Sequence, residues 1–510
     1  MSIELLDRSL LVGALVVLVA VAAVRLSLGS GLPSLLLYLG LGVALGEAGF
    51  GVRFDDAALT QVLGYSALVL ILAEGGLTTR WSSVRSAIAP AAALSTVGVV
   101  VSVLVVAGAT HLLLSTGWVV SLLVGAVLSS TDAAAVFSVL RRVPIHPRLA
   151  GVLEAESGLN DAPVVLLVVA LAEQASGRHE AGPWWSLVGL AAFELAVGAG
   201  VGVAVGWLGA AGLRRLKLPS SALFSLGMIA LTVLAYAGAA TVHASGFLAV
   251  YVAGLVLGNA HLPHGAAVRG FAEALGWLAQ IGLFVLLGLL ASPSRLGAQV
   301  LPALVLGLVL LLLARPLSVV VSMTPFRVPW RHQAFLSWAG LRGAVPVVLA
   351  TVPVTTGVPG TEWLFDLVFV LVIIFTLVQA PTLPWVARRL GVAGLVDTRD
   401  LDLEAAPLAV LDADVLQVRV GTDSRMHGLE VFELRLPAGA NITLVVRDGE
   451  GFVPDARTVL KRGDQLLVVT TSTARRATES RLRAVSRGGR LAVWARSADG
   501  RPRRRGSARP

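Results

Sequence analysis

Two short polar stretches of the chain carry the residues best suited to bind a cation. The first contains Thr131 and Asp132, and the second contains Glu156, Ser157 and Asp161. A carboxylate at membrane depth costs roughly 2.5 kcal/mol or more, so it is kept where it is paired, packed inside a bundle or bound to a positive ligand. Hard cations prefer carboxylate, hydroxyl and carbonyl oxygens. The pattern predicts a cation site that also carries protons.

Spacing along a helix places the second stretch on two neighbouring faces. Ser157 and Asp161 are four residues apart, as are Glu156 and Asn160, so each pair shares a helix face. The first stretch, 129–132, falls midway through an apolar segment, where small polar residues interrupt a helix. Interrupted helices that cross at mid-membrane are a common way for transporters to build ion sites.

A second interruption follows near the end of the apolar region, at 340–346, with the sequence Gly-Leu-Arg-Gly-Ala-Val-Pro. Pro346 removes a helix hydrogen-bond donor, and the two glycines loosen the turn before it. Arg342 is the cation that we place well inside a span, so it requires an anion. We predict that Glu156 is its partner, which leaves Asp132 and Asp161 for the ion.

The composition indicates a polytopic membrane protein. Of 510 residues, 56% are hydrophobic and 14% are charged, whereas soluble domains have about 25% charged residues. The net charge of +9 lies in short loops and an Arg-rich tail, which is typical of membrane topology and not of a nucleic-acid partner. The absence of cysteine excludes disulfides and thiolate chemistry.

The apolar stretches and the charges between them predict about thirteen spans, on the rule that ~20 residues cross a bilayer. Roughly 14 Arg and Lys residues follow odd-numbered spans, against 4 elsewhere. This bias predicts an external N-terminus and a cytoplasmic chain after Arg389. The predicted spans are 9–28, 33–49, 58–77, 87–113, 118–140, 149–173, 183–212, 219–241, 244–260, 270–291, 297–323, 332–356 and 362–387.

The broken spans 118–140 and 332–356 have opposite predicted orientations, as inverted repeats would produce. Residues 1–392 are therefore expected to form an all-α transmembrane domain, and 393–412 a linker. Alternating strand patterns and turn residues predict a small α+β cytoplasmic domain at 413–477. The Arg-rich remainder, 478–510, is predicted to be a disordered basic tail near membrane lipid.

Three motifs in order resemble the monovalent cation:proton antiporter-1 family: Ser-Thr-Asp-Ala-Ala-Ala-Val-Phe at 130–137, Glu-Ser-Gly-Leu-Asn-Asp at 156–161, and the stretch at 340–346. The resemblance covers about 9–390. It implies a homodimer whose six-helix transport bundle moves against a dimerisation scaffold. It also implies residue roles: Asp161 as the ion and proton carrier, Thr131, Asp132 and Ser157 as further ligands, Asn160 as a structural residue, Glu156 and Arg342 as a buried pair, and Glu74 near the ion path.

One departure bears on the choice of cation. Many sodium-exchanging members have Pro after the first Asp, whereas this chain has Ala133, which resembles the potassium/proton branch. Residues 431–466 are similar to a TrkA-C (RCK-C) domain, and the resemblance implies regulation of potassium transport, often by a small-molecule ligand. No cofactor is expected beyond the transported K+ or Na+ and H+.

These observations predict a secondary antiporter of the cytoplasmic membrane that works by alternating access and exchanges one cation per proton. A sodium/proton antiporter of the same fold and a ligand-gated cation channel remain alternatives, although the sequence has no repeated carbonyl filter of the channel type. Asp132 and Asp161 could instead be structural, capping broken helix ends or pairing with Arg342, and Glu74 could simply meet water at the membrane edge. The sequence has no enzyme motif such as a P-loop or a nucleophile elbow.

Overall fold

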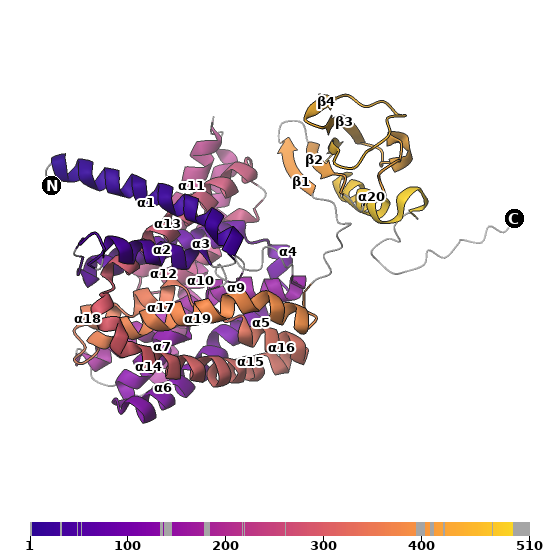
Figure 1. Cartoon of the computed structure of the whole chain (residues 1–510). Helices are drawn as coiled ribbons and strands as arrows, with labels where there is room; N and C mark the ends of the chain where they lie inside the picture. Colours follow the sequence, from indigo (N-terminus) through magenta and orange to yellow (C-terminus); the bar gives the residue numbers. More distant parts are fainter. Residues whose placement is uncertain are drawn as a thin grey trace. The chain divides into compact units, whose positions relative to one another are not determined.

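The computed structural model describes residues 3–393 and 403–492, apart from gaps at 31–32, 48, 53, 133–135, 137–144, 178–183, 217, 219, 261, 409–412, 422–423 and 472. The chain divides into two units, 1–394 and 395–510, and both are drawn in Figure 1. The first unit is helical, and the second is built around a sheet. A mostly helical membrane unit with a small α+β unit confirms the predicted fold class.

A helix lies at each of the thirteen predicted spans, although much of the second half of 118–140 lies outside the described residues. Among the described residues, eight helices are long and apolar enough to cross a membrane, and five shorter apolar helices accompany them. The helices are α1 (Ile3–Ser30), α2 (Ser34–Leu45), α3 (Ala57–Thr78), α4 (Trp81–Val84), α5 (Ile88–Ala93), η1 (Leu94–Gly98), α6 (Val99–Leu114), α7 (Trp118–Ser129), α9 (Pro147–Ala175), α10 (Trp184–Arg215), α11 (Ser221–Thr241), α12 (Gly246–Gly258), α13 (Gly265–Leu290), α14 (Pro293–Val309), η2 (Leu310–Ala314), α15 (Arg315–Met323), η3 (Thr324–Phe326), α16 (Trp330–Trp338), α17 (Ala344–Leu349), α18 (Val352–Thr356) and α19 (Glu362–Arg389).

The helices pack in two groups. One, here called the scaffold group, contains α1–α3 and α10–α13, in which α13 packs on α2 and α3, and α12 packs on α3 and α10. The other, the broken-helix group, contains α5–α9 and α14–α19, in which α7 packs on α6 and α9, and α14 packs on α19. The two groups form separate layers in Figure 1. Each half of the chain therefore contributes three spans to the broken-helix group, and the middle one of each three is interrupted.

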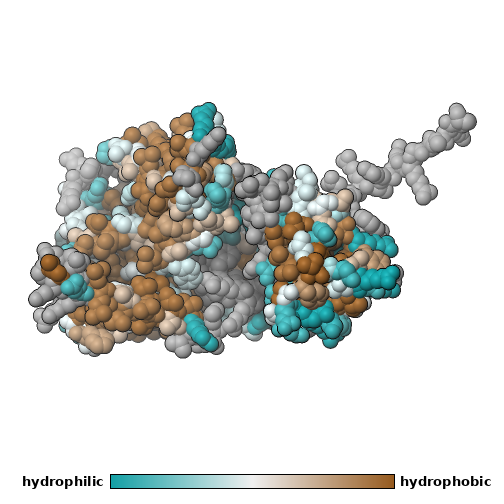
Figure 2. All heavy atoms as spheres, turned by 90° about the horizontal axis from the view of Figure 1, so that it is seen from above, coloured by the Kyte–Doolittle hydropathy of each residue, from teal (hydrophilic) through white to brown (hydrophobic). Residues whose placement is uncertain are grey.

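The surface of the helical unit is apolar, as a lipid-facing surface requires. Figure 2 shows hydrophobic residues over most of its visible face. Leu18 is 65% exposed, Trp207 66% and Leu312 64%. In water such a surface would be strongly unfavourable, because burying apolar area is worth about 25 cal/mol per Å². The exposed leucines and tryptophans therefore fit a bilayer environment.

The two interrupted spans meet where their backbones leave helical geometry. α7 ends at Ser129, and Ser130 is extended, with φ −64° and ψ 142°. The second span stops at Trp338 and resumes at Ala344. The Asp132 amide donates to the Leu341 carbonyl over 2.9 Å. This bond joins the two breaks and satisfies backbone groups that no helix satisfies.

The second unit is an antiparallel five-stranded sheet with the order β1-β2-β5-β3-β4. The hairpin turn between β3 and β4 uses Asp448 and Gly449, which both have positive φ (52° and 89°), as a type I′ turn requires. Alternate residues of β5 are buried and pack with Leu482 and Val485 of α20. The elements are β1 (Leu403–Leu408), β2 (Ala413–Arg419), η4 (Val431–Leu434), β3 (Ala440–Arg447), β4 (Glu450–Phe452), β5 (Gln465–Thr471), α20 (Arg475–Gly488) and η5 (Gly489–Leu491).

Two parts of this unit differ from the sequence-based boundaries. β1 lies inside 393–412, which was predicted to be a linker, and pairs with β2 along its whole length. α20 continues ten residues beyond 478, where a disordered tail was predicted. Its high Arg content concealed an amphipathic pattern in which Thr478, Leu482 and Val485 are buried. Residues 493–510 of the predicted tail lie outside the described residues.

Candidate functional site

A cavity of about 640 Å³ separates the two helix groups. Residues of α3 and α13 line one wall, and residues of α9 and the α7 break line the other. All five residues predicted to bind the cation or proton line this cavity: Glu74, Thr131, Asp132, Ser157 and Asp161. The structure therefore brings together residues from three separate spans.

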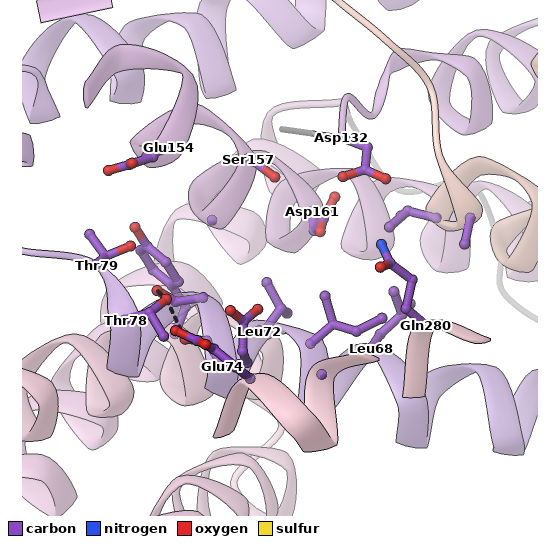
Figure 3. Close-up of a pocket in the computed structure, with 18 of the residues that line it drawn as sticks. Leu68, Leu72, Glu74, Thr78, Thr79, Asp132, Glu154, Ser157, Asp161 and Gln280 are labelled. Atoms are coloured by element: carbon purple, nitrogen blue, oxygen red, sulfur yellow. Dashed lines mark hydrogen bonds between the residues drawn. The ribbon is translucent and has the colours of Figure 1, made fainter. Parts of the chain in front are cut away.

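The cavity has two ends. Figure 3 shows Thr79 and Glu154 at one end, whereas Asp132, Asp161 and Gln280 lie at the other. Thr79 and Arg80 follow the end of α3, and Glu154 lies two turns into α9. The first end is therefore the mouth, on the side of the Arg-rich loops, and the second end is the floor.

Asp161 lies on the floor and is 6% exposed. The Ser130 hydroxyl donates to its Oδ1 over 2.8 Å. Ser130 can reach α9 because it directly follows the last residue of α7 and its backbone is extended. Two residues further along α9, Pro163 lacks the N–H that would bond the carbonyl of Leu159. The helix that carries Asp161 is thus weakened beside the site.

Asp132 lies on the same floor, held by the crossing of the two breaks. Its backbone N–H donates to the Leu341 carbonyl. Its carboxylate packs against Gly343, where the Cβ of any other residue would overlap Asp132 Oδ2. Ser157 lines the cavity one turn before Asp161. The carboxylates of Asp132 and Asp161 and the hydroxyls near them can thus serve as cation ligands. Across the described residues no three His, Asp or Glu side chains are arranged to hold a metal ion, so hydroxyl or backbone oxygens would complete the cation's coordination.

The predicted ion pair between Glu156 and Arg342 is wrong. Glu156 instead pairs with Arg315, whose Nη1 and Nη2 donate to Oε1 over 2.6 Å and to Oε2 over 2.9 Å. The Thr131 hydroxyl also donates to Glu156 Oε1, over 3.0 Å. Glu156 and Arg315 are 2% and 5% exposed, so a bidentate pair is sealed inside the broken-helix group.

Arg342 has a different task. Its Nη1 donates to the carbonyls of Ser129 (3.1 Å) and Ser130. These carbonyls belong to the end of α7, where backbone acceptors lack helical partners and the helix dipole is negative. Arg342 therefore caps the broken helix with its positive charge.

Asn160 binds the residue that follows the same break. Its Nδ2 donates to the Thr131 hydroxyl over 2.6 Å and to the Thr131 carbonyl over 3.3 Å. Asn160 is 1% exposed and does not line the cavity. It fixes the Thr131 hydroxyl as a donor to Glu156.

Glu74 lies nearer the mouth than Asp161 does, on α3 (Figure 3). Its side chain passes over Gly276 of α13, where a Cβ would come within 2.9 Å of Glu74 Cγ. The close packing of these two scaffold helices thus directs Glu74 into the cavity. This placement differs from that of a side chain that simply meets water at a membrane edge.

Sequence reasoning missed two residues. Arg315 lies within the apolar span 297–323, so its position alone marked a second buried cation. It follows the π-helical turn η2, and such turns are frequent at functional sites. Gln280 lines the cavity floor, and its signal was a carboxamide midway along the apolar span 270–291.

A membrane fold with broken helices that cross beside one buried and one half-buried carboxylate defines a secondary transporter of cations. Comparison of the sequence with known protein families agrees with this. Residues 12–389 match the family described as sodium/hydrogen exchanger, transmembrane, and residues 415–483 match the TrkA-C domain. The chain belongs to the sodium/hydrogen exchanger family and carries a TrkA-C domain.

Named relatives are similar over most of their length. The chain is 37% identical over 474 residues to the K+/H+ antiporter NhaP of Alkalimonas amylolytica, covering 91% of this chain and 82% of the relative. It is 34% identical over 475 residues to the K+/H+ antiporter NhaP2 of Shewanella sp. (strain MR-4), covering 92% and 82%. The sodium proton antiporter MjNhaP1 from Methanocaldococcus jannaschii superposes with a TM-score of 0.62 at 22% identity, covering 74% of this chain and 99% of that one. The last likeness shows the shared fold.

Proposed function

We propose that this protein exchanges K+ for H+ across the cytoplasmic membrane by alternating access. The observation that carries the proposal is the placement of Asp161 on the floor of a cavity, beside Asp132 and within hydrogen-bond reach of Ser130. Ser157, Thr131 and Glu74 contribute further oxygens along the same cavity. No cofactor is required beyond the transported ions.

Competition for one carboxylate couples the two fluxes. Ionised Asp161 attracts a cation, whereas protonated Asp161 has lost the charge that held it. The site therefore carries either a cation or a proton. Because Arg315 neutralises Glu156 and position 160 is Asn, we infer one cation for one proton and no net charge movement.

Alternating access would come from movement of the broken-helix group against the scaffold group. The contacts opposite the mouth support a state that is closed on the far side. There the Thr355 hydroxyl donates to Gln61 Oε1 over 2.7 Å, and Gly64 of α3 packs on Val348 of α17. With the N-terminus outside, the mouth opens toward the cytoplasm, where the Arg-rich loops lie.

K+ is the favoured cation because relatives named as K+/H+ antiporters match both units of this chain. The TrkA-C domain supports regulation by a small-molecule ligand on the cytoplasmic side. A homodimer formed through the scaffold group, surrounded by lipid, fits the exposed apolar surface. Exchange of Na+ is the second candidate, supported by the fold shared with MjNhaP1.

Reconstituted protein tests the proposal directly. In proteoliposomes that report internal pH by fluorescence, wild-type protein should release protons on addition of K+, with a smaller response to Na+. Asp161→Asn should remove both responses, because an amide can neither ionise nor carry a proton, while the protein stays folded. Exchange that survives in Asp161→Asn would contradict the proposed site, and a larger Na+ response would reverse the choice of ion.

A further inference from the structure

Gln280 is the carboxamide on the cavity wall: among the described lining residues no other Asn or Gln occurs. It belongs to α13, and its neighbours on the same face of that helix, Glu273, Gly276, Trp277 and Phe284, line the cavity as well. Their spacing of three, four and seven residues is that of one helix face. The whole stripe of α13 therefore faces the cavity.

The stripe places Gln280 at the depth of Asp161. On α9, Glu154 precedes Asp161 by seven residues, and on α13, Glu273 precedes Gln280 by seven residues. Seven residues are about 10.5 Å of helix. Both helices begin on the side of the Arg-rich loops. Glu154 and Glu273 therefore lie toward the mouth, and Asp161 and Gln280 lie toward the floor. Figure 3 agrees, since Gln280 lies at the same end of the cavity as Asp132 and Asp161.

The amide of Gln280 has nothing else to bind. In the described part of the chain it makes no hydrogen bond with protein, and its atoms are open to the cavity instead of sealed by packing. Apolar side chains that line the cavity near it, such as Leu68 and Phe284, offer no polar partner. An amide inside a membrane is costly unless it finds a partner. The binding partner left for the Gln280 amide is therefore a cation in the cavity, or a water molecule bound to that cation.

We propose that Gln280 determines cation specificity, by giving its amide oxygen to the ion that Asp161 and Asp132 hold. This inference rests on the proposed exchange at that site and names a further ligand of it. The oxygen is neutral, so it adds coordination without adding a second group that competes for the proton.

Ion size determines how much this ligand matters. A small ion is satisfied by few close ligands, whereas a larger ion takes more oxygens at longer distances, as Ca²⁺ does relative to Mg²⁺. K+ therefore gains more than Na+ from an additional oxygen on the far wall. The contact also spans the two helix groups, so movement of the broken-helix group would remove it and favour release on the other side.

The test is the same proteoliposome assay with Gln280→Leu, which removes the amide and keeps the volume similar. The KM for K+ should rise about tenfold, which corresponds to ~1.4 kcal/mol of binding. The KM for Na+ should rise about threefold or less, so that the preference shifts toward Na+. Gln299→Leu on α14, outside the cavity lining, should change neither value.

Two results would overturn the inference: a change below twofold for both ions, or an equal change for both. Either leaves the proposed exchange intact, because wild-type protein in the same vesicles reports that exchange independently. If Gln280→Leu does not fold, Gln280→Asn is the second variant. Its side chain is one methylene shorter, so the amide no longer reaches the ion, and the preference should again shift from K+ toward Na+. K+-dependent thermal stabilisation of each purified variant checks binding apart from transport.

Discussion

Glu156 and Asp161 are carboxylates on one helix, five residues apart, yet their surroundings are opposite. Five residues turn a helix by about 500°, so the two side chains point some 140° apart. Glu156 points into the broken-helix group, where Arg315 and Thr131 bind it. Asp161 points into the cavity, where a hydroxyl of Ser130 contacts one oxygen. In this membrane protein, the helix face decides whether a buried carboxylate is structural or exchangeable.

The same comparison separates the two buried arginines. Arg315 cancels the charge of Glu156, whereas Arg342 binds the carbonyls at the end of α7. Both stabilise the broken helices, but through different acceptors. Neither guanidinium lines the cavity, so neither repels the cation at close range. The carboxylates in the cavity keep their negative charge, because the two arginines bind Glu156 and the α7 carbonyls outside the cavity lining.

The largest expected effect tests the structural side of the comparison. Arg315→Leu removes the partner of a buried carboxylate, which costs about 3–5 kcal/mol when one member of such a pair is lost. The midpoint temperature of thermal unfolding of the purified protein should fall strongly. Arg331→Leu, at an exposed arginine of α16, is the control and should be nearly neutral.

The double variant Glu156→Gln, Arg315→Leu sharpens this test. It removes both charges, so part of the lost stability should return, since most of the cost of losing one partner comes from the buried charge that is left uncompensated. A double variant as unstable as Arg315→Leu alone would show that the arginine acts through packing and not through its charge.

A smaller effect is expected at Gly343, on the exchangeable side. A Cβ there overlaps Asp132 Oδ2, so Gly343→Ala must displace that carboxylate from the crossing. The KM for the cation should rise about tenfold, and stability should fall by roughly 1–3 kcal/mol, the cost of forcing an added methyl into tight packing. Gly108→Ala, where no atom lies within 4 Å of the added Cβ, is the matched control. An unchanged KM would mean that Asp132 does not contact the ion.

Sequence reasoning predicted the spans, both helix breaks and five of the polar residues that line the cavity, because apolar length and polar interruptions are local signals. It failed where the answer depended on packing between distant spans. Arg315 and Arg342 both lie within apolar spans, and no local pattern shows that Arg315, and not Arg342, packs against Glu156. The depth of Gln280 relative to Asp161 depends on how α9 and α13 are aligned, which no local pattern encodes.

β1 and α20 were missed for a related reason. β1 is paired with β2, and α20 packs on the sheet core. The composition of 393–412 and 478–488, by contrast, resembles a linker and a basic tail. A short strand or a charged helix can be recognised once its buried face is known. Before that, the polar residues dominate the pattern.

The smallest expected effect concerns a third carboxylate, Asp464, which repeats the structural arrangement outside the membrane. Arg447 donates to both of its oxygens over 2.8 Å, and the Lys461 amide donates over 2.7 Å. Burial raises the pKa of Asp464, but the hydrogen bonds from Arg447 and Lys461 outweigh it, so the pKa is below its usual value. A depressed pKa contributes stability that is present above the unfolded value of about 3.9 and is lost as pH falls through the folded value.

Hydrogen exchange of the full-length protein measures this contribution. After correction for the intrinsic rate, amides of β3 and β5 should stay protected from pH 7 down to about pH 4, and lose protection below it. Asp464→Asn at pH 7 should show the same loss, whereas Asp448→Asn, at the exposed turn, should not. Protection that is independent of pH would mean that Asp464 is held by packing alone, unlike Glu156, for which charge cancellation is expected to dominate.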